Sequence, residues 1–249
     1  MNPSGNTILI TGGGSGIGRG LAEALQKLGN QVIIAGRRQK VLDEATAANP
    51  GMQSLIVDVE QPGAISSFAA DAVEKFPALN VLINNAGIMR PEKLLEQPGE
   101  LTDSEAIVAT NLLGPIRLIA ALLPHLKQQP KATIMNVSSG LAFVPLAMTP
   151  TYCATKAAIH SFTQSLRWQL QSSNIEVVEI IPPYVQTELM GGAEDPRAMP
   201  LKDYIAETMA LLTSQPTPPE IIVERVKPLR FAADTGKYDA TFHGLNSNF

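Results

Sequence analysis

The sequence is poor in the residues that form disulfides, metal sites and strongly charged surfaces. Cys153 is the only cysteine, which excludes an intrachain disulfide, suits a reducing compartment and favours a small buried residue over a redox group. The three histidines, His125, His160 and His243, lack the spacing of metal ligands, so we expect packing or surface roles for them and no metal. The formal net charge of −4 argues against nucleic acid or an anionic membrane as the main partner.

Long apolar segments are also missing. No uninterrupted apolar run approaches the length of a membrane span, and the first residues have neither the basic nor the apolar region of a signal peptide. The sequence therefore predicts a soluble cytoplasmic protein with no membrane partner. Its 249 residues and 45% hydrophobic content are enough to bury a substantial core, so we expect one domain over residues 1–249.

Short apolar, β-branched runs alternate with longer amphipathic segments, which is the pattern of βα units around a parallel sheet. The predicted strands cover residues 7–11, 31–35, 53–57, 81–84, 132–137 and 176–181. The predicted helices include residues 16–28, 65–76, 104–128 with an interruption at 114–115, and 150–172. Right-handed crossovers would then give an α/β fold, a doubly wound and mainly parallel Rossmann sheet with helices on both faces.

A glycine-rich turn follows the first predicted strand and reads Thr-Gly-Gly-Gly-Ser-Gly-Ile-Gly from residue 11. Its spacing differs from Gly-x-Gly-x-x-Gly, but the physical demand is the same, because glycines allow close backbone approach and the next helix points its N-terminus at a pyrophosphate. Taken alone, the turn could also serve packing only. We predict that it binds the phosphates of a dinucleotide through Gly12, Ser15, Gly16, Ile17 and Gly18.

The end of the second predicted strand indicates which dinucleotide is bound. A carboxylate there would accept the ribose hydroxyls of NAD, but the sequence has Arg37 and Arg38 and no acid. Two guanidiniums can form charge-assisted hydrogen bonds to a 2′-phosphate. The sequence therefore favours NADP(H) over NAD(H), with the alternative that both arginines only solvate the start of a helix.

Tyr152 and Lys156 stand four residues apart in a predicted helix, so their side chains share one face. At roughly 4–5 Å and an effective dielectric near 20, the lysine would favour the phenolate by about 3–4 kcal/mol, or roughly two to three pKa units. This predicts a Tyr152 pKa close to working pH, as a proton-transfer group requires. Ser139 ends a predicted buried strand upstream, where its hydroxyl could hold a substrate oxygen.

These motifs, together with Asn84-Asn85-Ala86-Gly87, resemble the short-chain dehydrogenase/reductase family over residues 7–187. The resemblance implies reversible hydride transfer between a nicotinamide and a carbonyl or secondary alcohol, with Tyr152 as proton donor and Lys156 holding the ribose. It adds Asn111 as a fourth catalytic residue, which would organise a water-linked proton path. It also implies cofactor contacts at Asp58, Val59, Asn85, Ala86, Gly87, Tyr152, Lys156, Pro182, Val185 and Thr187.

Two of these assignments have alternatives. Asp58 could instead cap a turn, and Pro182-Pro183 could form a turn without cofactor contact, because the family usually has Pro-Gly there. That Pro-Pro pair, with Val-Glu-Ile-Ile before it and Tyr238-Asp239 near the C-terminus, resembles a bacterial branch of DltE-type oxidoreductases.

The substrate is expected to be a moderately hydrophobic ketone or aldehyde, because the candidate pocket residues are mostly apolar: Met89, Arg90, Leu141, Phe143, Pro145, Tyr184, Leu189 and Met190. Arg90 could anchor an anionic group or face solvent. A mobile loop at 191–196 and an amphipathic helix at 201–212 predict a lid over about residues 187–218.

The resemblance further implies a homodimer or homotetramer paired through the helix that carries Leu166, Trp168 and Leu170, although these residues could simply pack on the sheet. A non-catalytic NADP(H)-binding sensor is the main alternative function. An isomerase or epimerase that uses the nicotinamide transiently is a third, disfavoured by the chain length.

Overall fold

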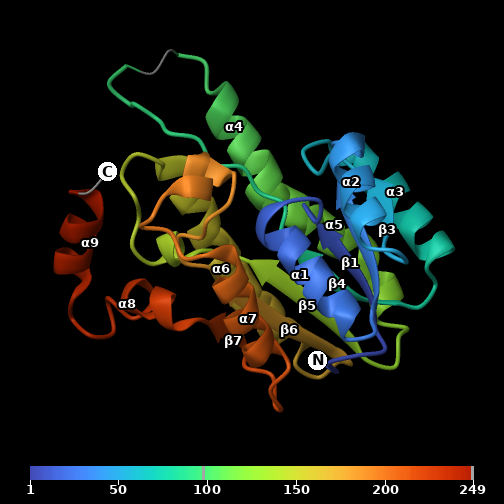
Figure 1. Cartoon of the computed structure of the whole chain (residues 1–249). Coiled ribbons are helices and arrows are strands. Elements are labelled where there is room, and N and C mark those ends of the chain that lie inside the picture. Colours follow the sequence, from blue (N-terminus) through green and yellow to red (C-terminus); the bar gives the residue numbers. More distant parts are fainter. Residues whose placement is uncertain (97–98, 248–249) are drawn as a thin grey trace.

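In the computed structural model, which describes residues 1–96 and 99–247, one parallel sheet runs through the molecule (Figure 1). The strand order is β3-β2-β1-β4-β5-β6-β7. β1 lies between β2 and β4, with Ile8 beside Val32 on one side and Val81 on the other. The strands are β1 Thr7–Thr11, β2 Gln31–Gly36, β3 Gln53–Ile56, β4 Leu79–Asn84, β5 Ala132–Val137, β6 Ile175–Ile181 and β7 Glu220–Ile222.

Helices connect the strands and cover the sheet. Those in the described part are α1 Gly16–Lys27, α2 Gln39–Ala48, α3 Pro62–Lys75, α4 Thr102–Val108, α5 Gly114–Leu126, α6 Pro150–Leu170, α7 Leu201–Leu212, α8 Lys227–Arg230 and α9 Tyr238–Asn246. A π-helical turn, Ala109–Leu113, joins α4 to α5, and short 3-10 helices occupy Gly140–Ala142, Leu189–Glu194 and Glu224–Val226.

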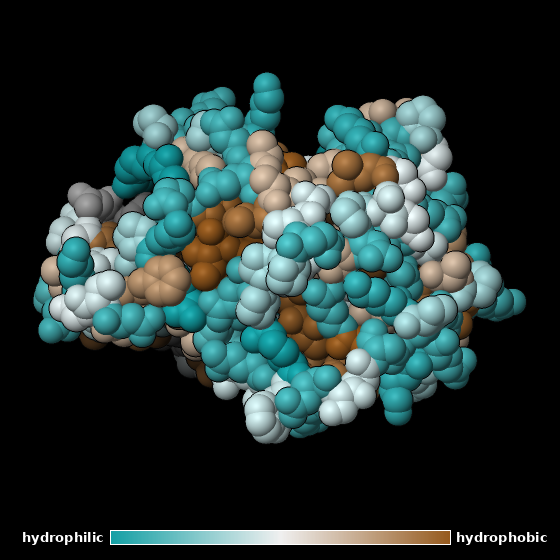
Figure 2. Space-filling view, turned by 90° about the horizontal axis from the view of Figure 1, so that it is seen from below, coloured by the Kyte–Doolittle hydropathy of each residue, from teal (hydrophilic) through white to brown (hydrophobic). Residues whose placement is uncertain are grey.

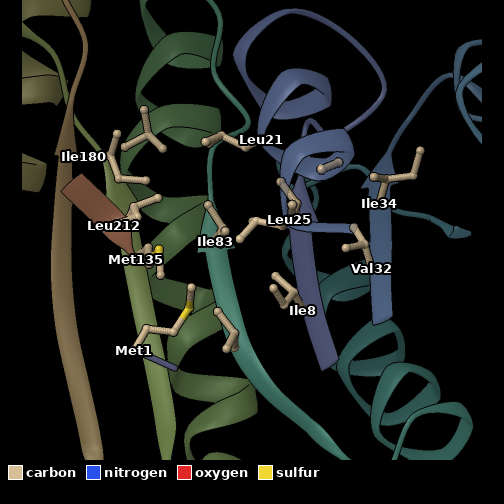
Figure 3. Packing of buried hydrophobic residues seen from close by; sticks show 14 of the residues in the cluster. Met1, Ile8, Leu21, Leu25, Val32, Ile34, Ile83, Met135, Ile180 and Leu212 are labelled. Atoms are coloured by element: carbon tan, nitrogen blue, oxygen red, sulfur yellow. The ribbon is translucent and has the colours of Figure 1, made fainter. Parts of the chain in front are cut away.

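Side-chain alternation along the strands creates two cores, because successive residues point to opposite faces of a sheet. Ile8 and Ile10 of β1 pack with α1, α2 and α7, whereas Leu9 packs with α3, α5 and α6. Figure 3 shows the first of these cores, where Leu21 and Leu25 of α1 meet side chains from β1, β2 and β4. The surface seen from below in Figure 2 is mostly hydrophilic, with hydrophobic residues gathered in recesses.

The predicted α/β Rossmann fold is confirmed, and the six predicted strands are all present with ends shifted by at most two residues. β7 was not predicted, because three residues carry too little pattern. The predicted interruption of the helix at Gly114-Pro115 is wrong. The helix continues from α4 through the π-helical turn into α5. Pro115 has no amide to donate, and the wider turn before it accommodates its ring without ending the helix.

The helical stretch Thr102–Leu126 is long and apolar enough, by length and composition, to cross a membrane. A helix in the core of a globular protein can have the same composition. Here Leu118, Ile119, Leu122 and Leu126 of this stretch are buried against the sheet. These four hydrophobic residues therefore pack in the second core, the one that contains Leu9.

The order in which the strands are added to the sheet reverses at β1. β2 and β3 extend the sheet on one side of β1, and β4 to β7 extend it on the other. In open α/β sheets a crevice forms at this switch point, at the carboxyl ends of the strands. The loops after β1 and β4 meet there.

Gly18, in the first turn of α1, tests how closely these loops must approach. A Cβ on Gly18 would collide with the Gly12 carbonyl oxygen and the Asn85 side-chain amide, whereas a Cβ on Gly63 of α3 would meet open space. We expect Gly18→Ala to lower the free energy of unfolding by about 1–3 kcal/mol and Gly63→Ala to leave it equal or raise it by up to about 1 kcal/mol. Urea unfolding of both variants measures this, and equal effects would contradict the packing role of Gly18.

Candidate active site

A cleft of about 680 Å³ opens at the carboxyl ends of the strands. It extends from the ends of β1, β2 and β3, past the ends of β4 and β5, to segments that follow β6. Most of the predicted site residues line it: Gly12, Ser15, Gly16, Ile17, Arg37, Arg38, Asp58, Val59, Asn85, Ala86, Gly87, Ser139, Tyr152, Lys156, Pro182, Val185 and Thr187. Gly18 and Asn111 are not among its lining residues.

The glycine turn has the backbone geometry that its sequence predicts. Gly12 and Gly16 have φ of 65° and 53°, in the left-handed region that favours glycine. Ser15 is the N-cap residue of α1, and its side chain makes no capping hydrogen bond to the helix. The first amides of α1 therefore face the cleft without a side-chain cap, which is the arrangement that binds anions.

The segment after β4 is held against the end of β1 by hydrogen bonds. The backbone amides of Asn85 and Ala86 both donate to Thr11 Oγ1 at 3.1 Å. Asn85 Nδ2 donates to the Thr11 carbonyl oxygen at 3.0 Å. A Cβ at Gly87 would lie 3.4 Å from Asn111 Oδ1 and 3.7 Å from Lys156 Nζ, so Gly87 is next to both of these side chains.

The ends of β2 and β3 supply the charged part of the cleft. Arg37 and Arg38 are exposed, and neither forms an ion pair with any residue of the described ranges 1–96 and 99–247. Asp58 Oδ1 accepts the backbone amide of Glu60 at 3.1 Å, so the turn-capping contact exists alongside the position of Asp58 in the cleft.

Tyr152 and Lys156 project from the first turns of α6 toward Ser139 at the end of β5, and all three side chains are buried. Lys156 Nζ lies 5.6 Å from the centre of the Tyr152 ring and donates to the Val137 carbonyl oxygen at 2.8 Å. Ser139 Oγ accepts the Leu141 amide at 3.1 Å, which fixes the hydroxyl at the start of a 3-10 turn.

Burial, and not the lysine, dominates the pKa of the tyrosine. Desolvation raises the pKa of Tyr152 to about 12, although a hydrogen bond with Ser139 lowers it. Desolvation also lowers the pKa of Lys156 to about 8. The predicted near-neutral Tyr152 pKa is therefore wrong, because the spacing of two residues on a helix does not show how far both groups lose contact with solvent.

Asn111 lies in the π-helical turn, a type of distortion that is frequent at functional sites. Its Oδ1 accepts the Ile88 amide at 2.9 Å, and its Nδ2 donates to the Ile88 carbonyl at 2.9 Å and to Thr155 Oγ1 at 3.3 Å. Asn111 thus joins the loop after β4 to α6, one residue from Lys156.

Glu92 is a site-forming residue that the sequence patterns did not reveal. Its carboxylate accepts the Thr151 amide at 3.0 Å, the Thr151 hydroxyl at 2.8 Å and the Ser104 hydroxyl at 2.9 Å. A carboxylate at a helix N-terminus interacts favourably with the helix dipole. Glu92 therefore anchors the start of α6 directly beside Tyr152.

The end of the cleft next to Ser139 is mostly apolar. Of the predicted pocket residues, Met89, Leu141, Tyr184, Leu189 and Met190 line it. Phe143, Pro145 and Arg90 are not among its lining residues. Arg90 forms an ion pair with Asp103 of α4, and Phe143 packs on His160.

The C-terminal helices complete this apolar end. Leu229 of α8 and Leu245 of α9 line the cleft. Asn246 fixes α9 there, because its Oδ1 accepts the Ala147 amide at 2.6 Å and its Nδ2 donates to the Pro145 carbonyl at 3.2 Å. The short C-terminal helices have no sequence motif, so the pattern gave no signal for these contacts.

The segment after β6 lies along the cleft and is held by polar contacts. Tyr184 Oη donates to Asp195 Oδ2 at 3.1 Å, and Arg197 pairs with the same carboxylate at 2.7 Å. The hydrogen bonds from Arg197 lower the pKa of Asp195 to about 2. Residues 191–196, predicted as a loop, partly form the 3-10 helix Leu189–Glu194, with Met190 and Gly191 at positive φ.

Comparison with known proteins agrees with this geometry. The family of short chain dehydrogenases matches residues 6–198. The Bacillus subtilis protein described as uncharacterized oxidoreductase DltE is 40% identical over 250 residues, covering 99% of both chains.

Solved structures have the same fold. A short chain dehydrogenase from Burkholderia cenocepacia in complex with NADP has a TM-score of 0.82 at 24% identity, covering 97% of this chain and 99% of its own. A short chain dehydrogenase/reductase from Burkholderia phymatum in complex with NAD has a TM-score of 0.81 at 20% identity. The match covers 99% of this chain and 97% of that chain. The family model matches residues 6–198, and the Bacillus subtilis relative is 40% identical over 99% of both chains. This chain therefore belongs to the short-chain dehydrogenase/reductase family and is an oxidoreductase of that family.

Proposed function

We propose that this enzyme is an NADP(H)-dependent reductase of moderately hydrophobic ketones or aldehydes, acting reversibly on the corresponding secondary alcohols. The observation that carries the proposal is the meeting of Ser139, Tyr152 and Lys156 between two unlike halves of one cleft. One half is lined by the glycine turn and by Arg37 and Arg38, and the other is lined by apolar side chains.

The residues present fit a dinucleotide. Glycine lets the turn pack directly against the segment after β4, since a Cβ on Gly12 would lie 2.9 Å from the Ala86 Cα, and the start of α1 then faces the cleft without a side-chain cap. The α1 amides can hold the pyrophosphate, and Asp58, Val59 and the Asn85-Ala86-Gly87 segment would contact the adenine and ribose portions. Pro182, Val185 and Thr187 would fix the carboxamide end. When bound, the cofactor supplies the hydride.

In the reductive direction, Tyr152 donates its phenolic proton to the carbonyl oxygen, because a tyrosine with a pKa of about 12 is fully protonated at neutral pH. The Ser139 hydroxyl hydrogen-bonds that oxygen as negative charge develops on it. Lys156, a cation below pH 8, stabilises the resulting phenolate and would hold the ribose. Asn111 would carry the water-linked path that returns a proton to Tyr152.

Arg37 and Arg38 favour NADP(H) over NAD(H). Their guanidiniums stand in the cleft at the end of β2, where the 2′-phosphate of the adenosine would lie. An Arg guanidinium forms paired, charge-assisted hydrogen bonds to phosphate, and no carboxylate stands at this strand end to accept ribose hydroxyls.

The apolar half of the cleft supports a hydrophobic substrate. Ile88, Leu146, Met148, Leu229 and Leu245 line it together with the apolar residues expected from the sequence. The predicted lid over about residues 187–218 is too long, because α7 packs with α1 in the first core and does not line the cleft. We propose that residues 187–197 act as a lid over this half, with the Tyr184, Asp195 and Arg197 contacts holding one of its positions.

We further propose that the enzyme works in the cytoplasm as a homodimer or homotetramer. The Cys153 thiol is free and buried, which suits a reducing compartment. Trp168, on the outer face of α6, is 73% exposed, and a large exposed aromatic side chain is typical of interfaces between subunits.

Replacing Tyr152 by phenylalanine tests the proton-transfer role. We expect turnover to fall by about 10²- to 10⁴-fold, while the affinity for NADPH stays within a few fold, because the ring and its packing remain. NADPH consumption with aldehydes, aromatic ketones, diketones and keto esters measures turnover, and calorimetry measures binding. Unchanged turnover would refute the assignment of Tyr152, and tight NADPH binding by a wild-type protein that reduces no carbonyl would favour the sensor.

Arginine-to-alanine variants test the cofactor preference. We expect Arg37→Ala and Arg38→Ala to weaken NADPH binding by about 10- to 100-fold, since hydrogen bonds to charged groups contribute about 1.5–3 kcal/mol. NADH binding should change little. Arg19→Ala is the matched control, because Arg19 pairs with Glu23 on α1 and does not line the cleft. Equal losses for NADPH and NADH would disprove the phosphate contact.

The pH dependence of reduction should report the protonation of Lys156. Because the pKa of Lys156 is lowered to about 8, kcat/KM should be level at neutral pH and decline as the pH rises through 8. Tyr152, with a pKa of about 12, does not titrate in this range. Lys156→Arg, whose guanidinium stays protonated, should lack this decline in any activity it retains. A wild-type profile that is level to pH 10 would contradict the assignment.

A further inference from the structure

A buried carboxylate lies directly behind the catalytic strand end. Glu179 of β6 is 0% exposed, and its Oε1 accepts the hydroxyl of Ser138 at 2.5 Å. His160 Nδ1, on α6, lies 3.0 Å from Oε1 and 2.8 Å from Oε2 of the same carboxylate. Glu179 therefore joins the end of β5 to α6, and both of these elements carry catalytic side chains.

A cation closes the outer side of this cluster. Arg230 of α8 binds both carboxylate oxygens of Glu220 on β7, at 2.8 and 3.2 Å, and lies 4.6 Å from the centre of the Phe143 ring. The ligand atoms of His160, Glu179 and Glu220 lie within 4.8 Å of one another, a spacing that could hold a metal ion. The guanidinium already supplies a positive charge to this group, so we interpret the cluster as an ionic network.

Lys156 contacts the same strand end from the other side. Its Nζ donates to the carbonyl oxygen of Val137, the residue before Ser138. Lys156 and Glu179 are thus bound to consecutive residues of one strand end, with both side chains removed from solvent. Buried charges require a partner of opposite sign, because isolated ions are costly in a low-dielectric interior.

The charged and titratable groups around Lys156 come from several elements. Tyr152 and His160 are on α6, Glu220 is on β7 and Arg230 is on α8. Glu179 is the group whose charge raises the pKa of Lys156 and so opposes the effect of burial. The phenol of Tyr152 is uncharged at neutral pH, and Glu220 is paired with Arg230. Glu179 is therefore the buried carboxylate whose negative charge acts on Lys156.

We propose that Glu179 is a positioning residue of the catalytic centre, which holds Ser138, and with it Ser139, at the end of β5 and supplies the buried negative charge that keeps Lys156 protonated. The proposal rests on the proposed function for the role of Lys156, but the link between Glu179 and Lys156 can be measured without turnover. A hydrogen-bonding role and a charge role also predict different effects for different substitutions.

The test is a titration of Lys156 by NMR in the full-length protein with ¹³C-labelled lysine, the Lys156 signal being assigned by its loss in Lys156→Arg. Glu179→Gln keeps the shape of the side chain and removes its charge. We expect the midpoint of the Lys156 titration to fall by about one pH unit, and the alkaline decline of kcat/KM to move by the same amount. Glu179→Asp, which restores the charge, should restore the midpoint.

Two further variants separate charge from shape. Ser138→Ala removes the hydrogen bond to Glu179 and keeps the charge, so turnover should fall while the Lys156 midpoint stays in place. Glu176→Gln removes a carboxylate from the opposite face of the same strand. It should change neither the turnover nor the midpoint of the Lys156 titration. Thermal unfolding of each variant confirms that it is folded.

An unchanged Lys156 midpoint in folded Glu179→Gln would overturn the proposal, as would an equal shift in Ser138→Ala. These outcomes differ from a failure of the proposed function. That failure would appear as a wild-type protein that reduces no carbonyl, and the NMR titration would still report whether Glu179 sets the charge of Lys156.

Discussion

The whole site depends on how closely the turn after β1 approaches the segment after β4. Gly12 and Gly18 leave room for Asn85 and Ala86, and Thr11 Oγ1 receives both of their backbone amides. This contact brings the two halves of the doubly wound sheet together at their switch point. The uncapped start of α1 opens into the resulting crevice, and the side chains of α6 enter it from the other side. A bulkier residue at either glycine would separate the segments that form the cleft.

Local signals explain how much of this could be predicted from the sequence. The central strands and the glycine turn were found because alternation, β-branching and glycine spacing are local properties. Helix periodicity placed Tyr152 and Lys156 on one face, and the resemblance to the short-chain dehydrogenase/reductase family joined Ser139 to them. β7 and the walls contributed by Leu229 and Leu245 could not be predicted, since short elements carry no period. The pKa of Tyr152 was wrongly predicted because burial is set by tertiary packing, which one helix face does not show.

Burial shifts the pKa values of Tyr152 and Lys156, the proposed proton-transfer groups, in opposite directions. The phenol becomes a weaker acid, and the ammonium more readily loses its proton. A site without water strengthens every electrostatic contact with a developing oxyanion. The same loss of water lowers the pKa of Lys156, so the lysine more readily becomes neutral. The polar contacts at the end of β5 reconcile these demands. The Val137 carbonyl accepts one hydrogen bond from the ammonium, and the charge of Glu179, behind Ser138, raises the pKa of Lys156 and so opposes the effect of burial.

The walls of the cleft come from different stretches of the chain. Thr11, Gly12 and residues 14–17, 35–38, 57–59 and 85–87 line the half with the glycine turn, whereas residues 188–191, Leu229 and Leu245 line the apolar half. The second group lies in loops and short helices outside the central strands. Substitutions there can reshape the apolar half without moving the strand ends that form the phosphate cradle. The architecture therefore lets substrate preference change while the dinucleotide end of the cleft stays constant, and oxidoreductases that share this sheet can differ in the molecules on which they act.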